Sequence, residues 1–393
     1  MPVPLPLDLY LPAVGNPLKI EYQIHSGRVS SVQVSLGYAH RGIEKLAEKQ
    51  NLWQDLVLLQ RVCGICTAAH TTCFCQALEK LGDISIPQPA AFIRTLVSEI
   101  ERIQSHLLPL IFLANQLDLS SCLSSLFEAR ESAAMMLFLV TGKRVNYDFN
   151  QIGGVRVNLK NPQHLKDLKG LENLKGDGNP VPIETLTGDV NPYLIETLTR
   201  ALLSRLDEFD RPLETVNRSL LMHPRLKGIG ILSLQDCQST SATGPVARAS
   251  GIGQDIRKAA GYAAYPKLDF QIPVKSTGDV LARCEVRVLE IGESIRMIRQ
   301  ILASLPSLAE SPLLIDPAPT LTPGAVTESV EAPRGENLYR ITLSDHLHLE
   351  QIQIKTPTER NLEALKITLT DSYAEDVPLI VSSLDPCYAC VER

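Results

Sequence analysis

Residues 18–36 alternate between hydrophobic and polar side chains. Leu18, Ile20, Tyr22 and Ile24 fall on one face of an extended chain, and a His-Ser-Gly-Arg turn leads into a second alternating run. A period of two is the spacing of side chains on one face of a strand, and a short polar turn joins the strands of a hairpin. This pattern predicts an N-terminal β-hairpin.

From about Ile43 the apolar spacing becomes that of α-helices. The clearest example spans residues 92–118, where apolar side chains recur at i, i+3 and i+4 over many turns. Pro109 lies inside this segment and is expected to kink it. Stretches with the same period predict further helices at about 122–141, 192–222 and 280–305.

The alternating pattern returns in the last part of the chain. Apolar residues within 339–343 and again at 352 and 354 predict short strands. Two segments rich in Pro, Gly or Asn, 161–192 and 305–324, are expected to be a long loop and a connector.

The predicted fold class is therefore α+β, with a predominantly helical body, a small N-terminal antiparallel sheet and short C-terminal strands. We expect an N-terminal β region at 1–42, a helical body at 43–310 and a C-terminal mixed region at 311–393. These three regions are expected to be integrated into one domain.

The composition indicates a folded protein that does not bind nucleic acid. Hydrophobic residues make up 44% of the 393 residues, which is enough for a substantial core. The net charge of −6 has the wrong sign for a nucleic-acid surface. The apolar runs are shorter than a membrane-spanning helix requires, and the first residues lack the features of a signal peptide, so we expect a cytoplasmic chain.

Two cysteine pairs of identical spacing are the most informative motif. Cys63 and Cys66 form one C-x-x-C unit, and Cys387 and Cys390 form another at the far end of the chain. Disulfides are rare in the cytoplasm, and nine cysteines cannot all pair, so the motif indicates metal or redox chemistry. Four thiolates suit a soft transition metal, which would here join the two ends of the chain.

The spacing alone leaves the metal open. Zinc is the commonest partner of four cysteines and would make a closed structural site. Disulfide exchange by one pair is disfavoured, because no thioredoxin-like βαβ pattern surrounds it. Cys73 and Cys75, next to the first pair, point apart on a helix and are expected to be small buried residues.

The residues that flank the cysteines match four motifs of a known family, in the family's order. The motifs R-x-C-G-x-C-x-x-x-H, D-P-C-x-x-C, R-G-x-E and E-A-P-R-G correspond to Arg61–His70, Asp385–Cys390, Arg41–Glu44 and Glu331–Gly335. Over nearly its whole length the chain resembles the large, catalytic subunit of [NiFe] hydrogenases. Stretches such as Ile152–Arg156 are similar to the complex I-like, membrane-bound energy-converting branch.

The resemblance implies a nickel ion bound by all four thiolates. Cys63 and Cys387 would be terminal nickel ligands, and Cys66 and Cys390 would bridge nickel to an iron that carries carbon monoxide and cyanide. Such a centre keeps open positions, as heterolytic cleavage of H2 into protons and electrons requires. Cys387 is the expected first proton acceptor, and Glu44 is the expected relay for that proton.

Further residues are expected around the metals because they match family positions. Arg334, with Pro333 beside it, and Ser383 match residues that contact the cyanide ligands. Asp385 lies in a strong motif and matches a carboxylate near the metals. Asp118 matches another such carboxylate, although only through its helix phase.

Two positions are expected to modify the site. His70 is expected to hydrogen-bond a cysteine sulfur and tune it. Some relatives bind a magnesium-type ion through a C-terminal histidine, and Arg393 stands at that place here, so this ion is left open.

The resemblance also implies partners. No cysteine set has the spacing of an iron–sulfur site, so electrons are expected to leave through a small hydrogenase subunit with a [4Fe–4S] cluster and then through ferredoxin. Ferredoxin-like and integral membrane subunits would complete a complex I-like assembly. The chain would then lie peripherally on the inner face of the cell membrane.

Two other functions are open at this point. A quinone-reducing complex I-like subunit shares the framework but has no need of four thiolates. A scaffold with structural zinc needs the thiolates but performs no H2 chemistry. Metal analysis distinguishes the three functions.

Overall fold

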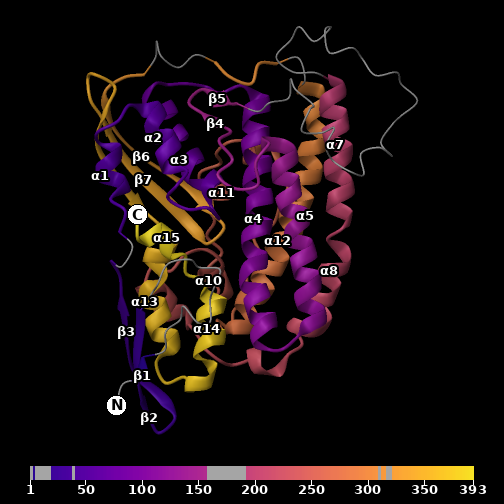
Figure 1. The fold of residues 1–393 in the computed structure, drawn as a ribbon, viewed down its shortest axis with the longest axis vertical. Coiled ribbons are helices and arrows are strands. Elements are labelled where there is room, and N and C mark those ends of the chain that lie inside the picture. Colours follow the sequence, from indigo (N-terminus) through magenta and orange to yellow (C-terminus); the bar gives the residue numbers. More distant parts are fainter. Residues whose placement is uncertain (1–2, 5–18, 38–39, 157–191, 309–310, 316–320) are drawn as a thin grey trace.

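The computed structural model describes residues 3–4, 19–37, 40–156, 192–308, 311–315 and 321–393. Long helices form one side of the molecule, and a three-stranded sheet with shorter helices forms the other (Figure 1). The predicted α+β class with a predominantly helical body is confirmed. The loop predicted at 161–192 lies, except for its last residue, outside the described residues.

The long helices follow the predicted apolar period. They are α4 (Gln88–Gln116), α5 (Ser120–Thr141), α7 (Pro192–Asp207) and α12 (Val280–Ser304), and the short helix α8 (Asp210–Thr215) follows α7. α4 runs through Pro109 as a single helix and packs against both α5 and α12. The helix predicted at 192–222 is interrupted before Pro212, which has no N–H to continue the hydrogen-bond ladder.

The three-stranded sheet on the other side of the molecule carries Arg334, one of the predicted site residues, in a turn. Strands β6 (Gly324–Ala332), β7 (Gly335–Leu343) and β8 (Leu349–Lys355) form an antiparallel sheet in that order. Ala332 pairs with Gly335, so Pro333 and Arg334 alone make the turn between β6 and β7. Helix α3 (Thr67–Leu81) packs on both strands of this hairpin.

The two ends of the chain lie side by side. β1 (Val3–Pro4), β2 (Lys19–His25) and β3 (Arg28–Ser35) form the predicted N-terminal antiparallel sheet, followed by α1 (Ile43–Ala47) and α2 (Leu52–Leu59). The last helices are α13 (Pro357–Leu369), α14 (Val377–Leu384) and α15 (Tyr388–Val391). α13 packs on β3 and α1 packs on β8, and Figure 1 shows the C-terminus beside α1.

Short elements complete the described chain. They are β4 (Asn150–Gln151), β5 (Gly154–Val155), α9 (Leu234–Ser239), α10 (Gly244–Ala249) and α11 (Ile256–Ala259), with a π-helical turn at Val216–Leu220 and 3-10 turns at Pro224–Leu226, Tyr265–Lys267, Leu305–Leu308 and Ala374–Asp376. One hydrophobic core extends from Ile20 to Cys390 and includes residues of all three predicted regions. Among the described helices, none is both long and apolar enough to cross a bilayer.

Candidate metal centre

The two cysteine pairs meet in the interior of the molecule. The Sγ atoms of Cys63 and Cys387 are 3.4 Å apart, as are those of Cys66 and Cys390. The Sγ atoms of Cys63, Cys66 and Cys390 all lie within 4.8 Å of one another. All four cysteines are buried and unbonded, since a disulfide would bring two sulfurs to about 2 Å. Four close soft donors fit a transition metal.

Local structure directs both pairs toward this point. Cys66 is the N-cap of α3, and the Cys63 carbonyl accepts a 2.8 Å hydrogen bond from Thr67 Oγ1. The amide of Ile65 donates to Cys63 Sγ at 3.3 Å. Because a helix N-terminus carries partial positive charge, α3 favours thiolates at its start.

The second pair is held by the C-terminal helices. Cys387 is the N-cap of the short helix α15, and its amide donates to Thr358 Oγ1 on α13 at 2.9 Å. Hydrogen bonds from the neighbouring thiols, that of Cys390 first, lower the pKa of Cys387 well below its ordinary value. Hydrogen bonding with Cys387 is the main cause that raises the pKa of Cys66 and Cys390 well above the ordinary value, so Cys387 loses its proton more readily than either of them.

His70 contacts this sulfur cluster. Its Nε2 lies 3.6 Å from Cys390 Sγ, and its Nδ1 lies 2.8 Å from the Tyr339 hydroxyl on β7. Burial lowers the pKa of His70 to about 3, so the ring is neutral at pH 7. Asn337 Nδ2, which can only donate, also lies 3.4 Å from Nδ1. We therefore assign Nδ1 as the acceptor and the ring proton to Nε2, where it faces the sulfur.

Arg334 and Asp385 form a buried pair beside the cysteines. Arg334 donates from Nη2 to Asp385 Oδ1 and from Nε to the Asp385 carbonyl, both at 2.8 Å, and from Nη1 to Ser105 Oγ at 3.1 Å. Burial alone would lower the pKa of Arg334, but Asp385 and the thiolates, Cys387 foremost, raise it well above its ordinary value. The second carboxylate oxygen of Asp385 is buried and has no partner. Arg334 therefore supplies a fixed positive charge near the sulfurs.

The position of the Arg334 turn depends on a network of buried charges. Arg102 on α4 donates to the carbonyls of Glu331 at 2.7 Å and of Ala332 at 3.3 Å. Arg248 donates to Glu331 Oε1 at 2.8 Å. These contacts hold the end of β6 in position. Glu331, the glutamate of the E-A-P-R-G motif, therefore has a structural role in holding the turn.

Ser383 is buried on α14, where its hydroxyl accepts from Arg283 Nε at 2.9 Å. The same hydroxyl donates to the Ile380 carbonyl at 2.7 Å. Its one hydrogen is thus directed within its own helix, so contact with a cyanide would require this hydroxyl to rotate. The turn residue Pro333 is buried as well.

Glu44 lies on α1 at the edge of the site. Its Oε1 accepts from the Ile354 amide at 2.8 Å and from Arg393 Nε at 3.2 Å. Arg393 also donates to the Cys390 carbonyl at 2.9 Å, so it links Glu44 to the second cysteine pair. Arg393 further contacts Glu359 at 3.3 Å, and a guanidinium between two carboxylates does not fit an additional magnesium-type ion.

The structure does not bring Asp118 into this site. Asp118 is exposed and lies just beyond the C-terminal end of α4. Ser105, which contacts Arg334, lies on the same helix about 20 Å earlier at a rise of 1.5 Å per residue. Helix phase from His106 fixed a direction around the axis but not a distance along it, which is why this prediction is wrong.

Glu101 is a site residue that the sequence did not single out. It lies on α4, and its two carboxylate oxygens accept from the amides of Ala68 at 2.8 Å and Ala69 at 3.1 Å, two and three residues after Cys66. Burial raises its pKa to about 8, although these hydrogen bonds oppose the shift. The signal was the spacing of four between Glu101 and Ser105, which puts two polar side chains on one face of an apolar helix.

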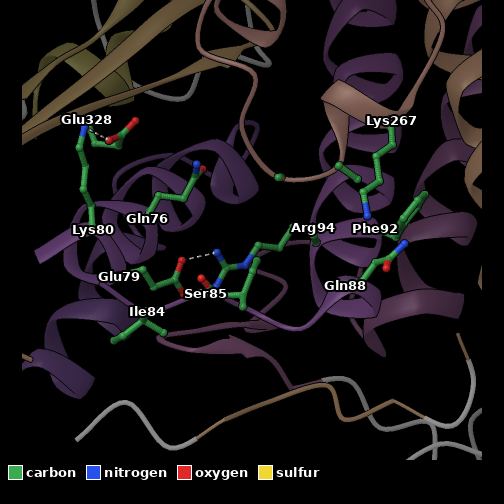
Figure 2. A pocket seen from close by; sticks show the side chains of 14 residues that line it. Gln76, Glu79, Lys80, Ile84, Ser85, Gln88, Phe92, Arg94, Lys267 and Glu328 are labelled. Atoms are coloured by element: carbon green, nitrogen blue, oxygen red, sulfur yellow. Dashed lines mark hydrogen bonds and ion pairs between the residues drawn. The ribbon is translucent and has the colours of Figure 1, made fainter. Parts of the chain in front are cut away.

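A cavity of about 450 Å³ lies away from the cysteines (Figure 2). It opens at the C-terminal end of α3, about 20 Å along this helix from Cys66. Figure 2 shows that Glu79 and Arg94 point toward each other and that Lys80 reaches Glu328, at 2.6 Å and 3.0 Å respectively. These charges are paired within the protein, and none of the four cysteines lines the cavity, so it is not part of the candidate centre.

Two protein families match this chain. The family described as nickel-dependent hydrogenase matches residues 41–164, which contain the first cysteine pair. The family described as the 49 Kd subunit of the respiratory-chain NADH dehydrogenase matches residues 184–320 and 308–393, which contain the second pair.

Individual relatives cover nearly the whole chain. The carbon monoxide-induced hydrogenase of Rhodospirillum rubrum is 33% identical over 385 residues, which is 97% of this chain and 96% of the relative. A subunit of the NADH-quinone oxidoreductase of Dehalococcoides mccartyi is 30% identical over 369 residues, with coverages of 93% and 91%. A chain of the membrane-bound sulfane sulfur reductase, an archaeal respiratory membrane complex, aligns with a TM-score of 0.79 and 26% identity over 100% of this chain and 98% of that chain. The chain therefore belongs to the family that unites nickel-dependent hydrogenase large subunits with the 49 kDa-type subunits of complex I-like enzymes.

Proposed function

We propose that this chain is the catalytic large subunit of an energy-converting [NiFe] hydrogenase, which interconverts H2 with protons and electrons. The observation that carries the proposal is the contact between the two cysteine pairs. The Sγ atoms of Cys63 and Cys387 are 3.4 Å apart, and so are those of Cys66 and Cys390. Four buried, unbonded thiols match the donor set of a nickel ion with an adjacent iron. Cys63 and Cys387 would be terminal nickel ligands, and Cys66 and Cys390 would bridge to iron.

When bound, an iron that carries carbon monoxide and cyanide beside nickel would supply the Lewis acid at which H2 is polarised. The chain's own part is to accept and remove the proton. Cys387 Sγ is the proposed first acceptor, and the Glu44 carboxylate is the proposed next one. The fixed charge of Arg334 would hold the diatomic ligands, with Pro333 and Ser383 completing their surroundings.

The proposal includes an assembly. Electrons would pass one at a time to a small subunit with a [4Fe–4S] cluster, and from there to a ferredoxin-type acceptor. Relatives of this chain are named as subunits of an NADH-quinone oxidoreductase and of a formate hydrogenlyase, and one aligned structure is that of an archaeal respiratory membrane complex. We infer the same setting here, with this chain peripheral on the cytoplasmic face of a membrane-bound complex.

Quinone reduction is the second candidate function, because subunits of NADH-quinone oxidoreductases are about as similar to this chain as a component of hydrogenase-4 is. A subunit of that kind would bind no metal through these cysteines. A zinc scaffold would bind zinc alone. The content of nickel, iron and zinc in the purified complex distinguishes these functions.

The direct test is infrared spectroscopy of the purified complex with the parent chain and with Cys387→Ser. The parent should show stretches of metal-bound carbon monoxide and cyanide, and Cys387→Ser should lose them together with nickel and H2 turnover. Cys237→Ser is the matched control, since Cys237 is also buried and unbonded but lies outside the cluster. Full H2 turnover in Cys387→Ser would contradict the proposal.

A further inference from the structure

Arg41 makes an unusual set of contacts between the two ends of the chain. It lies between β3 and α1, and its guanidinium donates to four backbone carbonyls. The distances are 2.5 Å to Arg61, 2.9 Å to Val62, 2.6 Å to Ala389 and 3.3 Å to Glu392.

These carbonyls belong to both cysteine pairs. Arg61 and Val62 are the two residues directly before Cys63, and Ala389 directly precedes Cys390. One planar side chain thus holds the backbone of the first pair against the backbone of the second. A guanidinium has five N–H donors in a fixed plane, whereas a lysine ammonium has three donors on a single atom and cannot reach carbonyls spread in this way.

All four contacts are to backbone carbonyls, and none is to a sulfur. Four thiols that approach one another lose chain entropy and, once ionised, repel one another, so something other than the ligands must hold the two segments together. Arg41 contributes both hydrogen bonds and positive charge.

We propose that Arg41 is a positioning residue that assembles the four-sulfur site before a metal enters it. It closes the two cysteine pairs on each other through their backbones and touches none of the sulfurs. The inference rests on the proposed metal centre and adds to it the residue that preorganises the site.

The test uses the metal-free full-length chain titrated with Co²⁺, whose thiolate charge-transfer absorption reports sulfur coordination. The parent should bind Co²⁺ through its cysteines. Arg41→Ala and Arg41→Lys should bind at least about tenfold more weakly, which corresponds to about 1.4 kcal/mol. A second measurement is the rate at which a thiol reagent modifies Cys387 and Cys390 in the metal-free chain. This rate should rise in both variants.

Arg28→Ala is the matched control. Arg28 also ties the N-terminal hairpin to the C-terminal part, through the Asp371 carbonyl at 2.6 Å and the Tyr373 hydroxyl at 3.1 Å, but it contacts neither cysteine pair. It should bind Co²⁺ as the parent does. Circular dichroism establishes that each variant is folded, and if Arg41→Ala does not fold, Arg41→Lys decides.

Parent-like Co²⁺ affinity and parent-like thiol reactivity in Arg41→Lys would overturn the inference while leaving the proposed function intact. A parent chain that shows no thiolate–cobalt absorption would instead overturn the metal centre itself, and the role of Arg41 with it.

Discussion

Two buried histidines show how single residues acquire their roles in this chain. His70 and His106 are each about 1% exposed or less, and burial lowers the pKa of both. The position of His70 after the first cysteine pair predicted a contact with sulfur, and its Nε2 lies 3.6 Å from Cys390 Sγ. Its other partner, Tyr339, could not be predicted, because no sequence pattern relates α3 to a strand hundreds of residues later.

The burial of His106 predicts that the free energy of unfolding of the metal-free chain depends on pH. Its pKa is lowered to about 4 by burial, against 6.5 in an unfolded chain, although Glu290 at 2.8 Å opposes the shift. The unfolded state therefore binds more protons between these values, and stability is lost as the pH falls from 6.5 toward 4. From pH 6.5 to 5 the loss due to this group is about 2 kcal/mol.

The check is urea unfolding of the metal-free chain at several pH values, for the parent and for His106→Asn. The variant should lose less unfolding free energy than the parent between pH 6.5 and 5. Identical pH slopes in the two chains would show that His106 does not titrate in this window.

A substitution of Glu44 should slow proton transfer without weakening metal binding. Glu44→Gln should keep nickel, because no cysteine is changed, yet slow the isotope exchange between D2 and water by about 100-fold or more. Glu48→Gln is the control, since Glu48 directly follows the same helix and pairs with Lys45 at 2.9 Å. An exchange rate in Glu44→Gln equal to that of the control would remove Glu44 from the relay.

At the level of elements, hydrophobic periodicity predicted the regular helices and strands. It did not predict the helix interruption or the turn, which depend on single residues and on close packing. The hairpin β2–β3 and helices α4, α5 and α12 follow directly from apolar spacing. The interruption before α8 was missed, because a single proline decides it. The position of the β6–β7 turn could not be read from the sequence either, since α10 sets it from outside the sheet.

Gly244, at the start of α10, fits against this turn. Its φ is 69°, and a Cβ at this position would overlap the Arg334 carbonyl oxygen. Gly244→Ala should therefore displace the Arg334 turn and lower the unfolding free energy by at least about 3 kcal/mol, from left-handed backbone strain plus overlap.

Gly142→Ala separates these two causes. Gly142 has a similar φ of 75°, but nothing lies within 4 Å of the place that a Cβ would take, so only the backbone cost of about 1–2 kcal/mol applies. Thermal or urea unfolding measures both variants. Equal destabilisation of the two variants would mean that the packing of Gly244 against Arg334 contributes nothing.

At the scale of the whole molecule, the site exists because the two ends of the chain pack together. The repeated C-x-x-C spacing and its flanks predicted that the ends would share a metal, and the sulfurs do lie 3.4 Å apart in crossed pairs. The sequence did not reveal the contacts that hold the ends: α13 on β3, α1 on β8, and the guanidinium of Arg41. Such contacts join surfaces without any shared sequence pattern.

Removal of residues 387–393 should therefore loosen the opposite end of the chain. Arg41 would lose two of its four carbonyl partners, and Glu44 would lose Arg393. Hydrogen exchange, followed by mass spectrometry, should become faster at residues 41–66 while α4 and α5 keep their protection. The double variant Cys387→Ser/Cys390→Ser, which keeps the chain, should leave the exchange of this segment close to that of the parent metal-free chain; unchanged exchange in the truncated chain would contradict this coupling.

X-ray absorption at the nickel edge of the purified complex tests the central claim most directly. The account predicts nickel with about four sulfur ligands and a neighbouring iron, with the sulfurs supplied by the cysteines of both ends of the chain. A complex that contains only zinc, or nickel bound mainly by nitrogen and oxygen, would contradict it.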